Sequence, residues 1–334
     1  MPIRDSYILG FRYKYLNAAG KSKMLGGDTG SVTRDGISLN NNLIFFRDVH
    51  KTGRHKNNVV ISLKPYATVN REISENIIKS HNSLVIKVDE ILAEKVKSII
   101  DRQCTAMIAR DKWGHLTREQ RDKQFTRTEC ARCEAIIDLT ETKVSNLVYC
   151  KYCETLFDKF GYALIDSEEY KVCPECGYYG RVQDYYDFQA YNVYTDSEFS
   201  RRKHHCCDTC AHRMFQRNFW KNMLFIFGGA AVILEKIRSR RTRNPLYKDL
   251  QKANLLAQEG SYKDADVLYQ EIILRNDRHP GIYMNHGKMF LEAGEREKAA
   301  FQFKKSLDSC SNYLPTLRVL QSNVDLDMDS IGFD

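Results

Sequence analysis

Residues 130–153 read CARCEAIIDLTETKVSNLVYCKYC, and this stretch decides how the middle of the chain folds. It contains two Cys-x-x-Cys pairs with sixteen residues between them. Two thiolates separated by two residues can reach one ion from a single tight turn, and two such turns complete the tetrahedral shell of a structural zinc site. The stretch therefore predicts a zinc ribbon built on β-hairpins.

Two further pairs follow, so that four pairs use eight of the eleven cysteines, and we expect two structural Zn²⁺ ions. Pairing neighbours in chain order assigns one ion to the first two pairs and the other ion to the last two. A cross-braced arrangement, in which the first and third pairs share an ion, is the alternative. Thirty residues separate the third pair from the fourth, so Cys206 is an alternative to Cys207. The predicted ligands are Cys130, Cys133, Cys150, Cys153, Cys173, Cys176, Cys207 and Cys210.

Disulfides and redox catalysis are the other common uses of paired cysteines. Disulfides persist mainly outside the reducing cytosol, and residues 1–15 are charged and lack the apolar core of an export signal. A redox motif is one pair beside a βαβ unit, whereas these pairs recur in tandem. We therefore expect a cytoplasmic protein. We also expect no enzyme, because a closed four-thiolate site leaves no position for substrate and no nucleophile and base are grouped by a recognisable spacing.

A second pattern is an internal repeat within residues 245–320. Four residues recur at a constant offset of 34: Gly260, Ala265, Tyr269 and Ile273 as Gly294, Ala299, Phe303 and Leu307. This period, with Gly at a turn and small and aromatic residues along the next helix, resembles the tetratricopeptide repeat. The resemblance implies two helical hairpins. Because each repeat buries its face only against a neighbour, we expect a capping helix over Tyr313–Leu320.

The resemblance also implies a partner surface. Tetratricopeptide proteins present a concave groove to peptides, and Asn254 and Asn285 fall where polar groove residues lie in that family. Lys288, one turn after Asn285, would share its face. We expect these three residues to contact a protein or peptide partner, with solvated polar side chains as the alternative. Leu250 stands where family members that hold a peptide carboxylate carry Lys, so a carboxylate clamp is not expected.

Residues 213–244 combine a short apolar run with strongly basic flanks. The uncharged run 223–234 would span about 18 Å as a helix, against about 30 Å of hydrocarbon in a bilayer. Residues 213–243 hold eight Lys or Arg against Glu235 alone, on both sides of the run, which a single span does not favour. We expect a basic, apolar helix that covers the first repeat. Shallow membrane association and a true span are the alternatives.

Residues 1–110 show strand-like runs followed by a helix. Asp89 is expected to cap a helix that runs to about Ala109 and carries an apolar face from Ile91 to Ile100. Several strands and one closing helix resemble the pleckstrin-homology-like fold. That likeness implies a module for partners or lipid headgroups, with an unrelated α+β domain as the alternative. The expected strands are Tyr7–Tyr13, Gly36–Leu39, Leu43–Arg47 and Val59–Leu63.

The predicted fold is therefore multidomain α+β, with a β-rich N-terminal domain, zinc-ribbon hairpins and C-terminal helical repeats. The function that we expect is a non-enzymatic adaptor that binds protein partners. The alternative is a nucleic-acid-binding zinc protein, because aromatic residues between Tyr178 and Phe199 precede a basic cluster and can stack on bases. The remaining boundaries are a charged linker at 111–128, a double zinc ribbon at 129–212 and an acidic tail at 321–334.

Overall fold

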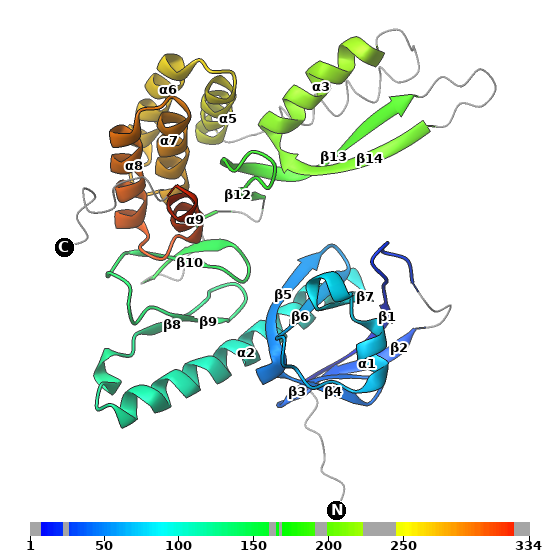
Figure 1. The fold of residues 1–334 in the computed structure, drawn as a ribbon. Coiled ribbons are helices and arrows are strands. Elements are labelled where there is room, and N and C mark those ends of the chain that lie inside the picture. Colours follow the sequence, from blue (N-terminus) through cyan, green and yellow to red (C-terminus); the bar gives the residue numbers. More distant parts are fainter. Residues whose placement is uncertain are drawn as a thin grey trace, which may run out of the picture. The chain divides into compact units, whose positions relative to one another are not determined.

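The computed structural model describes residues 8–22, 27–159, 165–166, 169–190, 199–222 and 245–323. The chain divides into two compact units. Unit 1 is Met1–Thr142 with Cys150–Glu154, and unit 2 is Lys143–Tyr149 with Thr155–Asp334. The fold is α+β as predicted, with an N-terminal antiparallel sheet, central hairpins that carry the cysteines and a C-terminal run of paired helices (Figure 1).

Unit 1 is built on one antiparallel sheet with the strand order β4-β3-β2-β1-β7-β6-β5. The first strand shows why it forms: Phe11, Tyr13 and Tyr15 alternate with charged residues and are buried in the core. Its register pairs Leu9 with Val32. The strands are β1 (Leu9–Tyr15), β2 (Asp28–Val32), β3 (Gly36–Leu39), β4 (Asn42–Phe45), β5 (Val49–His55), β6 (Asn58–Leu63) and β7 (Ser83–Val88).

The four predicted strands correspond to β1, β3, β4 and β6, and the prediction for β3 is correct at both ends. Sequence reasoning does not find β2, β5 or β7. The sequences of β2 and β5, DTGSV and VHKTGRH, contain Gly and polar residues in place of an apolar run, so their pairing depends on neighbouring strands. The short helical elements of the unit are η1 (Phe46–Asp48), α1 (Arg71–Asn76), η2 (Lys79–His81) and η3 (Asp122–Gln124).

Helix α2 (Glu90–Arg118) packs against β5 and β6 through its first half. Asp89 caps it as predicted, with the carboxylate accepting a hydrogen bond from the Ile91 N–H at 3.0 Å. Val96 and Ile100 are fully buried in the core of the sheet. Ile91 was expected on the same apolar face but is 85% exposed, so the buried stripe begins later in the helix.

The second half of α2 continues past Ala109, where the helix was expected to end. The first part of the predicted linker 111–128 is therefore helical. Lys112 explains the extension in part, because its Nζ lies 2.6 Å from the Asp138 carboxylate and ties the helix to the β8–β9 hairpin. Figure 1 shows this half of α2 beside the hairpin, which is formed by β8 (Arg127–Glu129) and β9 (Ile136–Asp138).

Unit 2 contains the helices predicted from the 34-residue repeat. The turn glycines Gly260 and Gly294 have φ angles of 82° and 80°, which favour glycine. Both turns close with a 2.9 Å hydrogen bond. The Ser261 N–H donates to the Leu256 carbonyl oxygen, and 34 residues later the Glu295 N–H donates to the Phe290 carbonyl oxygen. The sequence period is thus a repeated backbone geometry. The helices are α5 (Pro245–Gln258), α6 (Tyr262–Arg275), α7 (Pro280–Glu292), α8 (Arg296–Ser309) and α9 (Leu314–Ser322).

The central strands of unit 2 form hairpins that lead into helix α3 (Asp208–Asn222). Arg213 on α3 donates a hydrogen bond to Gln258 on α5 at 3.1 Å. The start of the segment predicted as a basic helix is therefore helical, whereas residues 223–244 lie outside the described part of the chain. In the ranges that are described, no helix has the length and apolar character needed to cross a bilayer. The strands are β10 (Leu147–Cys150), β11 (Thr155–Asp158), β12 (Tyr170–Val172), β13 (Tyr179–Ala190) and β14 (Phe199–Cys207).

Gly287 on α7 provides a test of the packing in unit 2. A Cβ atom at this position would lie 2.7 Å from the Phe303 ring and 3.1 Å from the Ala299 carbonyl oxygen. We expect Gly287→Ala to lower the free energy of unfolding of unit 2 by about 1–3 kcal/mol, although alanine favours helices. Gly114→Ala on α2 is the control, because no atom lies within 4 Å of its Cβ position. Urea unfolding should show unchanged or slightly higher stability for the control, and an equal response of both variants would contradict the packing.

Candidate metal centres and partner-binding residues

The eight predicted ligands form two groups of four thiols, one in each unit. Within each group the sulfur atoms all lie within 4.8 Å of one another. The groups follow the chain order of the pairs, so the cross-braced alternative is wrong, and Cys207 rather than Cys206 completes the second group. The groups are Cys130, Cys133, Cys150 and Cys153, and Cys173, Cys176, Cys207 and Cys210.

Three of the Cys-x-x-Cys turns share one backbone geometry. The carbonyl oxygen of the first cysteine accepts a hydrogen bond from the N–H four residues later, at 3.0 Å for Glu134, 2.8 Å for Glu154 and 2.9 Å for Gly177. Each of these later residues has a positive φ, of 57°, 58° and 72°. The left-handed residue closes a tight turn, and both sulfur atoms of the pair face the same site.

The fourth pair is held differently, because it lies at a junction of strand and helix. Cys207 ends β14 and Cys210 lies in the first turn of α3. The Cys207 N–H donates to the Cys173 sulfur at 3.2 Å, and the Cys210 N–H donates to the Cys207 sulfur at 3.5 Å. Backbone N–H groups at the start of a helix stabilise negative charge, so this position favours thiolates.

The sulfur positions fit zinc rather than disulfides. Sulfur atoms of different pairs lie 3.5 Å apart for Cys130 and Cys153, and 3.6 Å apart for Cys176 and Cys207. Zn–S bonds of about 2.3 Å in a tetrahedron place sulfur atoms about 3.8 Å apart, whereas a disulfide requires about 2.05 Å. All eight cysteines are free thiols. Each group therefore suits a closed structural ion, which gives rigidity and offers no open coordination position.

The crowding of the thiols favours binding of a cation. Four thiolates at these distances repel one another, and a divalent cation removes that repulsion. Hydrogen bonds between neighbouring thiols, followed by burial, raise the pKa values of Cys133, Cys150, Cys207 and Cys210. Hydrogen bonds from the same neighbours lower the pKa values of Cys130 and Cys173. Because the protonated groups must lose their protons to bind metal, the affinity for zinc decreases as the pH falls.

Helix α2 supports the first group through side chains that no spacing rule identifies. The Ser98 hydroxyl donates to the Cys133 carbonyl oxygen at 2.9 Å, and the Lys97 ammonium donates to the Tyr152 carbonyl oxygen at 2.6 Å. Lys97 also pairs with the Asp101 carboxylate, whose side chain is only 3% exposed. The turns of the first group are thus anchored to the helix that closes the N-terminal sheet.

The predicted partner-binding asparagines contact a segment of their own chain, at the start of β13. The Asn285 carboxamide accepts from the Tyr179 N–H at 2.6 Å and donates to the Tyr179 carbonyl oxygen at 2.7 Å. Asn254 donates to the same carbonyl oxygen at 3.0 Å. Both asparagines are buried, at 2% and 0% exposure for Asn254 and Asn285. The face of α5 and α7 that was expected to bind a peptide is therefore occupied from within unit 2.

Lys288 is engaged by the neighbouring tyrosine. Its Nζ lies 5.1 Å from the centre of the Tyr178 ring and 3.1 Å from the Glu292 carboxylate. The Tyr178 hydroxyl donates to the other Glu292 oxygen at 2.6 Å. Tyr178 and Tyr179 belong to the core of the helical array, so these two rings are not available to stack on bases. Sequence reasoning missed these contacts because the residues that meet are 75 to 114 positions apart in the chain.

No model of a known protein family, no curated protein and no solved structure matches this chain.

The two metal centres predict a defined stoichiometry. We expect mass spectrometry with elemental detection to find two zinc ions per purified chain and one ion in Cys207→Ser, because three thiolates hold zinc weakly against a competing chelator. The matched control is Cys206→Ser, which changes the adjacent and equally buried thiol outside the group. It should keep both ions. Two tightly held ions in Cys207→Ser, or the loss of one in Cys206→Ser, would contradict the grouping.

The contact between Asn285 and Tyr179 predicts a large loss of stability on truncation. Asn285→Ala leaves the buried Tyr179 N–H without an acceptor, which costs about 1–3 kcal/mol of the free energy of unfolding. Asn323→Ala is the control, because its amide only donates near the end of α9, to the Val319 carbonyl oxygen and the Ser322 hydroxyl. That change should stay within about 0.5 kcal/mol. Urea denaturation measures both, and an Asn285 variant as stable as the control would rule out the role assigned to this contact.

Proposed function

We propose that this chain is a non-enzymatic adaptor that binds protein partners and is organised by two structural zinc ions. In this proposal, α5–α9 act as a short tetratricopeptide-type array. The recurrence of the Gly260 turn geometry at Gly294 supports that assignment. Unit 1 acts as a pleckstrin-homology-like module, and its antiparallel sheet and closing helix α2 support the likeness. The closed geometry of both thiol groups supports a structural role for the metal.

One observation carries the proposal of protein binding: large apolar side chains are exposed on neighbouring helices of the array. Leu274 on α6 is 86% exposed, and Val267 and Phe301 are each 57% exposed. Leu274 and Phe301 line one groove. Grouped apolar side chains at the surface are typical of sites that bind other proteins, because association removes them from water.

The buried aromatic residues of the zinc ribbon favour the adaptor over the nucleic-acid binder. Tyr178, Tyr179 and Tyr185 are at most 3% exposed and fill the cores of unit 2. A ring that stacks on a base must be accessible. Tyr186 of the same predicted cluster is half-buried, and Tyr191 and Tyr194 lie outside the described part of the chain.

The proposed function can be tested by quantitative affinity capture with the full, zinc-loaded chain from nuclease-treated and untreated extracts. We expect discrete proteins to be recovered in near-stoichiometric amounts, regardless of nuclease. Their recovery should change little between about 50 and 200 mM salt, since apolar contacts are not screened as phosphate contacts are. Recovery of nucleic acid with a steep salt dependence would favour the alternative. Absence of any protein above a bait-free control would contradict the proposal.

A further inference from the structure

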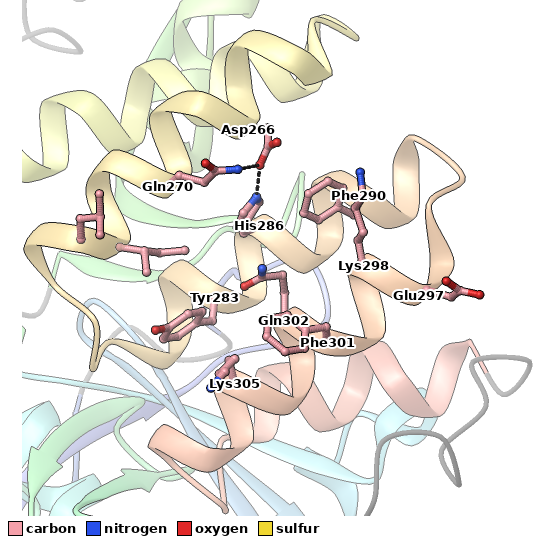
Figure 2. Close-up of a pocket in the computed structure, with 12 residues that line it drawn as sticks. Asp266, Gln270, Tyr283, His286, Phe290, Glu297, Lys298, Phe301, Gln302 and Lys305 are labelled. Atoms are coloured by element: carbon pink, nitrogen blue, oxygen red, sulfur yellow. Dashed lines mark hydrogen bonds and ion pairs between the residues drawn. The ribbon is translucent and has the colours of Figure 1, made fainter.

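A groove of about 700 Å³ lies between α6 and α8, with α7 as its floor (Figure 2). It is termed the α6–α8 groove. The exposed side chains of Leu274 and Phe301 line it, together with Tyr283 and Phe290 from α7. Its volume is within the range of pockets that hold side chains or small ligands. The groove therefore offers an accessible apolar surface.

The α6–α8 groove is separate from the face that Tyr179 occupies. At 100° per residue, Gly281, Asn285 and Lys288 fall on one side of α7. Tyr283 and His286 fall on the opposite side and line the groove. The contacts with β13 thus leave the groove open.

The floor of the groove contains a buried histidine with one nitrogen unpaired. His286 is 2% exposed, and its Nε2 lies 2.7 Å from the Asp266 carboxylate. A carboxylate accepts hydrogen bonds, so Nε2 carries the proton and Nδ1 is an acceptor. Burial lowers the pKa of His286, which keeps the ring neutral. Among the described residues, neither Nδ1 nor the Oε1 of Gln302 has a hydrogen-bond partner.

The two unpaired atoms are both acceptors in this orientation of the Gln302 carboxamide. Figure 2 shows the Gln302 carboxamide on α8 close to the His286 ring. A half-turn of this carboxamide would let its N–H₂ group donate to His286 Nδ1, but the Gln302 oxygen would then move to the outer position. In that orientation Gln302 pairs with His286, and the Gln302 oxygen faces the groove as an acceptor. A bound molecule that donates to the Gln302 oxygen would complete the hydrogen bonding of this site.

The charges around the groove select the kind of donor. Asp266 and Glu297 line the groove, and within the described ranges neither carboxylate forms a salt bridge with a Lys or Arg. The two lysines of the lining offset this negative charge only in part. Lys298 pairs with Glu295 at 2.5 Å, and Lys305 lies over the Phe301 ring, 5.6 Å from its centre. Two carboxylates without a Lys or Arg partner against one lysine without a carboxylate partner leave an excess of negative charge among the described residues of the lining, which favours a positively charged donor.

We infer that the α6–α8 groove binds a segment of a protein partner that presents an apolar side chain next to a Lys or Arg. The apolar side chain packs on Leu274 and Phe301. The cationic side chain donates to Gln302 and lies near the Asp266 carboxylate. This inference rests on the proposed adaptor function and names its binding surface and the chemistry of its partner.

A random 12-residue peptide library displayed on phage, selected against the intact zinc-loaded chain, tests the inference. We expect enriched peptides to combine Leu, Ile or Phe with a nearby Lys or Arg. Fluorescence anisotropy then measures the affinity of the most enriched peptide. Leu274→Ser should weaken binding about tenfold or more, because it removes a largely exposed apolar contact. The matched control is Val267→Ser, on the same helix but outside the groove lining, and it should leave the affinity unchanged.

Substitutions of Gln302 test the predicted sign of the charge. Gln302→Glu places a carboxylate beside the expected cation and should tighten binding severalfold. Gln302→Lys supplies a competing cation and should weaken binding at least tenfold. The two variants replace the same half-buried side chain, so a general loss of packing would affect both in the same direction. The inference is overturned if no peptide is enriched, if enriched peptides lack a cation, or if Gln302→Glu and Gln302→Lys act alike.

Two outcomes separate this inference from the proposed function. If affinity capture recovers partners equally with the wild-type chain and Leu274→Ser, the adaptor function stands and the groove is not its binding surface. If capture recovers no protein at all, the adaptor function itself fails. Light scattering adds a third outcome: a dimer that Leu274→Ser converts to a monomer would identify the occupant as a second copy of the chain and overturn the inference.

Discussion

The close approach of four cysteine sulfur atoms is the constraint on which the rest of the structure depends. Several strands beside the cysteines are short, as in β8, β9 and β12, and strands of this length do not hold a fold by themselves. Thiolates within 4.8 Å of one another need a cation, and the bonds to that cation contribute directly to folding. In the second group, the position of Cys173 is linked to that of Tyr178. The Cys173 N–H donates a hydrogen bond to the Tyr178 carbonyl oxygen at 2.9 Å. A metal ion bound by this group would therefore fix the chain just before Tyr179.

The fixed position of Tyr179 explains how a short helical array is completed. Each helical repeat buries its apolar face only against a neighbour, so two repeats leave surfaces to be covered. Helix α9 contacts α7 and α8, and the tyrosine pair fills the face of α5 and α7. The Tyr179 ring can pack here because Gly281 has no side chain. A Cβ atom at this position would lie 2.6 Å from the ring. The cysteine-bearing hairpins of unit 2 and the helices therefore share one core. The sequence patterns predict them as separate modules and do not predict this shared core.

The features that could be predicted from the sequence are local ones. Ligand spacing identified all eight thiols of the two groups, and the 34-residue offset identified the paired helices, because each pattern reports a geometry set within a few turns of chain. The segments that form β2 and β5 contain too few apolar residues to be recognised as strands from the sequence. The contact of Asn285 with Tyr179 also could not be predicted from the sequence. A polar residue at a groove position indicates a hydrogen-bonded contact, but the sequence does not show whether its partner is another protein or Tyr179 of the same chain.

The two sides of α7 show how one helix can serve both stability and binding. On the Asn285 side, the carboxamide uses its oxygen and its nitrogen on the Tyr179 backbone, and Asn254 accepts further bonds from Tyr269 and Asn285. On the His286 side, the ring is anchored by Asp266, while acceptors next to it have no donor among the described residues. An unpaired buried acceptor lowers stability. The hydrogen bonds of Asn285 stabilise α7 from its internal side, and in the binding inferred for the α6–α8 groove a partner would supply the missing donor. One face of α7 thus stabilises the array through Tyr179, while the opposite face keeps hydrogen-bonding groups for the partner inferred above.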